Sequence, residues 1–109
     1  MIRNLYAIGN GWAVSMSMSL IKLLGIDPIN SYFIFQISNQ QLEIREIVGE
    51  ELSNSKNNLI RKFTKNGKGF ALYLPNSVLE LLEIDPEIDK IKIAVEKNIM
   101  IIKKHIIAG

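Results

Sequence analysis

Residues 9–28 read GNGWAVSMSMSLIKLLGIDP, and this stretch decides the fold because a second version of it, GKGFALYLPNSVLELLEIDP, occupies residues 67–86. Nine of the twenty positions are identical when Gly9 is aligned with Gly67. Random pairing would give about one identity. We therefore expect two copies of one supersecondary unit, with repeat 1 at residues 2–47 and repeat 2 at residues 59–104.

Each copy reads as strand, turn, strand, helix, strand, turn, strand. The first turn lies at Gly9–Gly11 in repeat 1 and at Asn66–Gly69 in repeat 2, where glycine and asparagine reach the positive φ of tight hairpins at low cost. In the strand after each turn, apolar residues alternate with others and predict an inward face. That face comprises Trp12, Val14 and Met16 in repeat 1 and Phe70, Leu72 and Leu74 in repeat 2. We expect Trp12 and Phe70 to pack in the core rather than to stack on nucleic-acid bases.

A short helix follows in each copy, with apolar residues at i, i+3 and i+4 that predict one buried stripe. The stripe comprises Leu20, Leu23 and Leu24 in repeat 1 and Val78, Leu81 and Leu82 in repeat 2. An Asp-Pro pair ends each helix, at residues 27–28 and 85–86. The last two strands keep the same inward face in both copies, namely Phe33, Phe35, Ile37, Leu42 and Ile44 in repeat 1 and Ile91, Ile93, Val95, Met100 and Ile102 in repeat 2.

The length of 109 residues fits one domain. A copy of about 45 residues buries too little apolar surface to offset its chain entropy, so the two copies should pack together or intertwine. The polar and aperiodic segment 48–58 is long enough to link them, and residues 105–109 form a short tail. We expect residues 1–109 to form one mainly β domain with two short helices.

The composition excludes several classes of function. The chain has no Cys and a single His, His105, so it offers no disulfide, no Cys/His zinc site and no thiol nucleophile. No nucleophile is paired with a base and no glycine loop cradles a phosphate, so we expect no enzyme, no small-molecule substrate, no cofactor and no metal. The longest uncharged stretch, residues 4–21, is broken by glycines and serines. It predicts neither a membrane span nor a signal peptide, and we expect a cytoplasmic protein.

Charge is segregated along the chain, although the net charge is only +2. Residues 55–70 carry no acid and five cations, namely Lys56, Arg61, Lys62, Lys65 and Lys68. This run is either a surface that neutralises nucleic-acid phosphates, which we favour, or a solvated strand with its turn. Residues 80–89 carry five carboxylates without the pattern of a calcium loop, and we interpret them as a solvated acidic face.

The repeated segments resemble the SpoVT/AbrB and MazE-like swapped-hairpin family. The resemblance rests on GNGWAV at residues 9–14 and GKGFALYLP at residues 67–75, each followed by an amphipathic turn that ends in Leu-Leu-x-Ile-Asp-Pro. Repeat 1 departs from the family's strand end at Ser17, where repeat 2 has Pro75. The resemblance implies a pseudo-twofold swapped-hairpin, double-psi-like β-barrel of two ββαββ units. The resemblance implies that here one chain supplies both units. It is compatible with either a monomer or a homo-oligomer of the chain.

The same resemblance implies a transcriptional regulator that binds double-stranded DNA. Family contacts come from a basic pair on the first strand and from a residue beside the turn glycine. Carried over by position, and with Lys65 added from the basic run, the expected DNA surface is Arg3, Asn10, Arg61, Lys62, Lys65 and Lys68. Asn10 and Lys68 stand at turn tips, where they either read base edges or only supply turn geometry. The helix positions that are basic in the AbrB branch hold Ile21, Lys22, Leu79 and Glu80, so that part of the pattern is largely absent.

Two other functions stay open. A protein-interaction or assembly module with a degenerate DNA surface is favoured by repeat 1, in which three of the lysines of repeat 2 are replaced. Asn4, Ala7 and Asn10 stand where repeat 2 has Lys62, Lys65 and Lys68. An antitoxin-like repressor is the third hypothesis, and it would need a long tail after the barrel, where only residues 105–109 follow.

Overall fold

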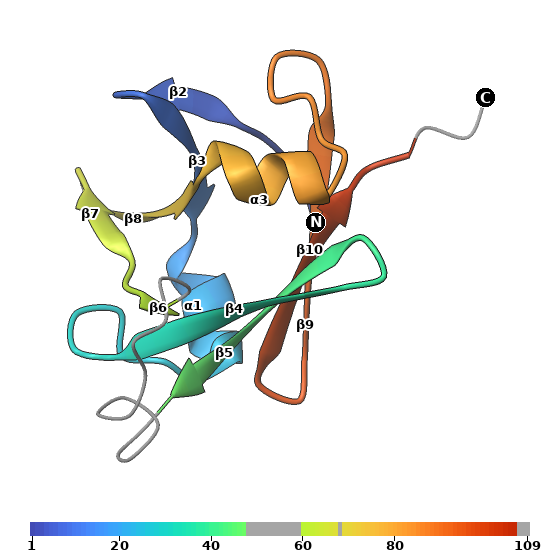
Figure 1. The fold of residues 1–109 in the computed structure, drawn as a ribbon. Coiled ribbons are helices and arrows are strands. Elements are labelled where there is room, and N and C mark those ends of the chain that lie inside the picture. Colours follow the sequence, from blue (N-terminus) through green and yellow to red (C-terminus); the bar gives the residue numbers. More distant parts are fainter. Residues whose placement is uncertain (48–59, 68, 107–109) are drawn as a thin grey trace.

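The structure is a computed structural model that describes residues 1–47, 60–67 and 69–106 (Figure 1). The expected linker at residues 48–58, the expected contact residue Lys68 and residues 107–109 of the tail lie outside the described residues. The described part of the chain is mainly β with two short helices, as expected. None of its helices is long and apolar enough to cross a membrane. None of its side-chain clusters brings together three potential metal ligands.

The two halves of the chain contain the same succession of elements. In the first half these are β1 (Ile2–Asn4), β2 (Tyr6–Ile8), β3 (Gly11–Met16), α1 (Met18–Leu24), β4 (Tyr32–Ser38) and β5 (Gln41–Ile47). In the second half they are β6 (Ile60–Arg61), β7 (Thr64–Asn66), β8 (Gly69–Leu74), α3 (Asn76–Leu81), β9 (Lys90–Glu96) and β10 (Ile99–Lys104).

The strands pair antiparallel in two sheets. One sheet has six strands in the order β1-β9-β10-β5-β4-β6, and the other has four in the order β2-β3-β8-β7. The expected closed barrel is therefore not formed, because within the described residues each sheet keeps two edge strands and no ladder joins the sheets. The cause lies in the first strand of each copy, which breaks at Leu5 and at Lys62–Phe63 and continues in the other sheet. Leu5 and Phe63, which occupy equivalent positions of the two copies, are both buried at these crossings.

The first strands of the two halves are exchanged between the halves. β1 pairs with β9 of the second half, whereas β6 pairs with β4 of the first half. The two ladders have the same register: Arg3 lies opposite Ile91, and Arg61 lies opposite Phe33. The alignment that matches Gly9 with Gly67 also matches Arg3 with Arg61 and Phe33 with Ile91, so the exchange follows the sequence repeat.

The two central ladders pair residues that the sequence repeat aligns with each other. Val14 lies opposite Leu72 where β3 pairs with β8, and Glu43 lies opposite Ile101 where β5 pairs with β10. Exchanging the halves therefore leaves the strand order of both sheets unchanged.

The core lies between the inner faces of the two sheets and the helices. The expected inward faces of the last two strands are confirmed, since Phe33, Phe35, Ile91 and Ile93 are buried and Ile37 and Val95 pack against the core. Leu42, Ile44, Met100 and Ile102 are also buried. Trp12 and Phe70 are partly buried against the core, as expected.

Both helices are rotated from the expected phase. The buried residues of α1 are Leu20, Ile21 and Leu24, whereas Leu23 is 65% exposed. In α3 and its C-cap the buried residues are Val78, Leu79 and Leu82, whereas Leu81 is 61% exposed. Each helical residue advances about 100°, so residues i, i+1 and i+4 span one arc of about 100° and residue i+3 lies about 60° outside it. The assignment of Leu23 and Leu81 to the buried stripe was therefore wrong.

Candidate nucleic-acid interface

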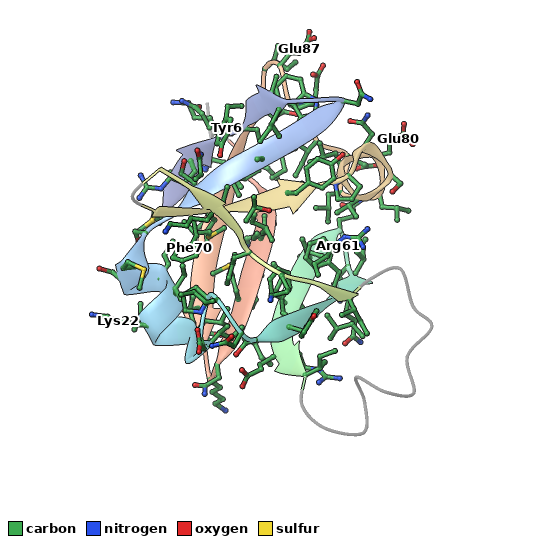
Figure 2. The ribbon with its side chains drawn as sticks, turned by 90° about the vertical axis from the view of Figure 1, so that its left-hand side faces the viewer. Tyr6, Lys22, Arg61, Phe70, Glu80 and Glu87 are labelled. Carbon is green, nitrogen blue, oxygen red and sulfur yellow. The ribbon has the colours of Figure 1, made fainter. Side chains whose placement is uncertain are left out.

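An open hollow of about 380 Å³ lies on the outer face of the four-stranded sheet. β3 and β8 turn Val14 and Leu72 into the core, so the neighbouring Ala13 and Ala71 face away from the core and form the floor. The lining comprises Ile8, Gly9, Asn10, Ala13, Thr64, Ala71 and Tyr73. Figure 2 views the molecule from the side on which this sheet lies. Ala13 and Ala71 are only 1% and 2% exposed, so the other lining side chains supply most of the surface that a ligand would meet.

Asn10 is the expected contact residue that the structure places in this hollow. It lies in the turn between β2 and β3, after Gly9, whose φ of 54° falls in the left-handed region that favours glycine. Asn10 is exposed, and its amide carries both a donor and an acceptor. These are the groups with which asparagine reads the edge of adenine in the major groove.

Two tyrosines that their sequence positions alone do not mark as functional lie on the same face. Tyr6 and Tyr73 flank Ala13 in one row across β2, β3 and β8. Tyr73 lies over Gly11, where an added Cβ would overlap its ring, so only glycine leaves room for this position of Tyr73. The hydroxyl of Tyr6 accepts a hydrogen bond from Nδ2 of Asn66 at 2.9 Å. The strand alternation was the available signal for Tyr73, because it occupies an outward position of β8.

The cations of repeat 2 follow one another from β6 into β7. Arg61 is half-buried, and its Nη1 donates to the carbonyl oxygen of Ile60 at 3.3 Å. Lys62 is exposed, with its ammonium 5.0 Å from the centre of the Tyr32 ring, a cation–π distance. Lys65 is exposed on β7. It lies on the strand face opposite to that of Thr64, so the structure does not place it in the hollow.

Arg3 lies on β1 and is half-buried. Its Nε is shielded from solvent and has no hydrogen-bond partner among the described residues, which leaves contact with a phosphate to its Nη atoms. β1 and β6 are the two edges of the six-stranded sheet. Arg3 and Arg61 therefore stand at opposite edges of that sheet, and neither lines the hollow.

These cations have no acidic ion-pair partner in the part of the chain that the structure describes. No carboxylate of residues 1–47, 60–67 or 69–106 forms an ion pair with Arg3, Arg61, Lys62 or Lys65, whereas Lys104 pairs with Asp89 at 3.5 Å. The pKa of Asp27 is lowered by the hydrogen bond from the Asn30 side chain, then by that from the Ile29 N–H, with the charge of Lys62 as the smallest cause. The unpaired cations leave their charge available to an anionic partner.

Comparison of this chain with protein-family models, with curated proteins and with solved structures gave no match.

Proposed function

We propose that this protein is a double-stranded DNA-binding transcriptional regulator built from two swapped-hairpin units of the AbrB/MazE type in one chain. The exchange of β1 and β6 between the halves supports the swapped-hairpin architecture. The recurrence of each register at equivalent positions of the two halves supports a pseudo-twofold relation between the units. The sheets remain open at their edges, so the proposal concerns the strand exchange and not a closed barrel.

One observation carries the DNA-binding role: cations without an ion-pair partner among the described residues run from β6 into β7, the strand whose Thr64 lines the hollow on the outer face of the four-stranded sheet. Arg61, Lys62 and Lys65 supply positive charge for phosphates, which provide most of the affinity of duplex binding. Asn10, Thr64 and Tyr73 supply hydrogen-bonding groups at the hollow, as base readout requires. This division between phosphate contacts and base contacts is that of a sequence-reading DNA interface.

The test is a salt titration of duplex affinity with single-residue variants, measured by fluorescence anisotropy. Each phosphate neutralised contributes about −0.9 to the slope of log affinity against log salt. We expect Lys62→Ala and Lys65→Ala each to reduce that slope by about one unit. Asn10→Ala should leave the slope unchanged and relax the sequence preference by about 1–3 kcal/mol if it reads a base.

Lys97→Asn is the matched control. Lys97 lies in the turn between β9 and β10 with φ 50°, and Asn39, its equivalent in the first half, adopts φ 53° in the corresponding turn. Asparagine therefore fits this turn, and the variant removes one charge away from the hollow. Equal slopes for Lys97→Asn and Lys62→Ala would show diffuse attraction and would reject the interface.

A protein-interaction or assembly module is the second candidate, and a specific observation favours it. Leu23 and Leu81 occupy equivalent positions on α1 and α3 and are 65% and 61% exposed. Two matched exposed leucines suit contact with another protein surface. Sedimentation velocity tests this candidate: concentration-dependent association that Leu23→Ser or Leu81→Ser abolishes, in a protein that binds no duplex at low salt, would establish it in place of DNA binding.

A further inference from the structure

A second group of cations lies on the outer face of the six-stranded sheet. β9 and β10 pair so that Lys92 lies directly opposite Lys103. The backbone N–H of His105 donates to the carbonyl oxygen of Lys90 at 2.9 Å, which extends this ladder and sets His105 opposite Lys90. Because side chains alternate along a strand, these four side chains emerge on one face. We call Lys90, Lys92, Lys103 and His105 the β9–β10 basic group; its three lysines are exposed and His105 is half-buried.

The lysines of this group have no ion-pair partner among the described residues, although Glu83 and Asp89 line a neighbouring hollow together with Lys103 and His105. Ile2 and Asn4 of β1 lie opposite Lys92 and Lys90, and Gln41 of β5 lies opposite Lys103. Glu43 lies one row further along β5 on the same face. Neither Glu43 nor any other carboxylate of the described residues forms an ion pair with these three lysines, and the Asp89 ion pair is made by Lys104 on the other face.

The fold itself does not need the two lysines. Like charges directly opposite each other on a sheet destabilise it. In the first half, the equivalent positions hold Ile34 and Arg45, which pair in the same register as Lys92 and Lys103. The same ladder therefore forms without a Lys–Lys pair, and an anion held between the two ammonium groups would remove their repulsion.

We propose that the β9–β10 basic group is a second duplex-binding surface, which holds the phosphates of a DNA backbone. A hollow of about 260 Å³, whose lining includes Lys92, Lys103 and His105, gives phosphate oxygens room beside the ammonium groups of Lys92 and Lys103. The row of cations with no acidic partner is complementary to a regular row of phosphates. At these rows β1 and β5 add no charged residue, and they offer Asn4 and Gln41 as further hydrogen-bond donors.

The two surfaces lie on different sides of the fold. Figure 1 shows β9 and β10 on the side away from β7 and β8. A short duplex cannot reach both sides at once, so one chain should hold two short duplexes. The expected number of two duplexes per chain rests on the proposed function, because it counts the interface described above. Binding of one duplex at the β9–β10 basic group does not rest on it.

The experiment counts duplexes bound per chain by stoichiometric titration of the full chain with a 12-base-pair duplex at low salt. The wild type should bind two, and Lys92→Gln/Lys103→Gln should bind one. The melting temperature of this double variant should equal or exceed that of the wild type, because the variant removes a like-charge pair. Lys97→Asn, at the opposite end of the same hairpin, should still bind two.

The outcomes separate the two proposals. If the wild type binds one duplex that is lost in Lys92→Gln/Lys103→Gln and kept in Lys62→Ala/Lys65→Ala, the β9–β10 surface stands and the interface proposed above fails. If Lys92→Gln/Lys103→Gln binds as many duplexes as the wild type, with unchanged affinity, the second surface is overturned.

Discussion

Alanine substitution of two adjacent leucines, Leu81 and Leu82, tests how the second helix packs. Leu82 is 1% exposed, and truncating a leucine so buried costs about 3–5 kcal/mol through lost burial and the remaining cavity. Leu81 is 61% exposed. Full burial of a leucine is worth about 1.5–3 kcal/mol, so its buried two-fifths contribute about 0.6–1.2 kcal/mol. The higher helix propensity of alanine offsets about 0.2 kcal/mol of the loss caused by Leu81→Ala.

We therefore expect Leu82→Ala to lower the free energy of unfolding by at least about 2 kcal/mol more than Leu81→Ala. With a urea m value of about 1.5 kcal/mol/M, the two transition midpoints should differ by more than about 1 M. Urea unfolding followed by circular dichroism measures this difference directly. Equal losses for the two variants would refute the helix phase described above and restore the i, i+3, i+4 stripe that the spacing predicts.

Two further predictions concern the equivalence of the halves. Glu83→Gly should raise the free energy of unfolding by about 0.5 kcal/mol. Glu83 has a left-handed φ of 58°, and the strain that glycine relieves there is larger than the two costs of the change, namely the backbone entropy of glycine and the loss of the exposed hydrogen bond from Gln40. Gly25→Ala, at the equivalent position with φ 78°, should lower it by about 1 kcal/mol or more, and thermal melts check both variants. Residues 1–50 and 56–109, expressed separately, should be unfolded or homodimeric by sedimentation, because each half takes its edge strand from the other; two folded monomers would disprove the exchange.

Much of the fold follows from sequence periodicity, and its failures have physical causes. Strand alternation predicts the inward faces because period 2 holds along each long strand, as Phe33 and Ile91 show. The helices span only about two turns, too short for spacing to define their phase, so Leu23 and Leu81 were misplaced. The break of the first strands at Leu5 and Phe63 has no local signal, because it arises when each strand crosses between the two sheets.

The candidate site was less predictable than the fold. Asn10 carries a local signal, the glycine turn, and the structure places it in the hollow. Tyr6 meets Asn66 from the other half of the sequence, and that contact appears only once β2 and β7 belong to one sheet. The opposition of Lys92 and Lys103 likewise depends on the register of β9 and β10, which composition alone does not specify.

The proposed binding of duplex DNA through surface cations is tested most directly by the salt dependence of wild-type binding to a random duplex pool. About four to six phosphate contacts predict a log–log slope of roughly −4 to −5. Fluorescence anisotropy of a labelled pool between about 50 and 200 mM salt covers the range in which such a slope changes affinity by about two to three orders of magnitude. A slope near zero, or no binding at the lowest salt, would contradict the DNA-binding role.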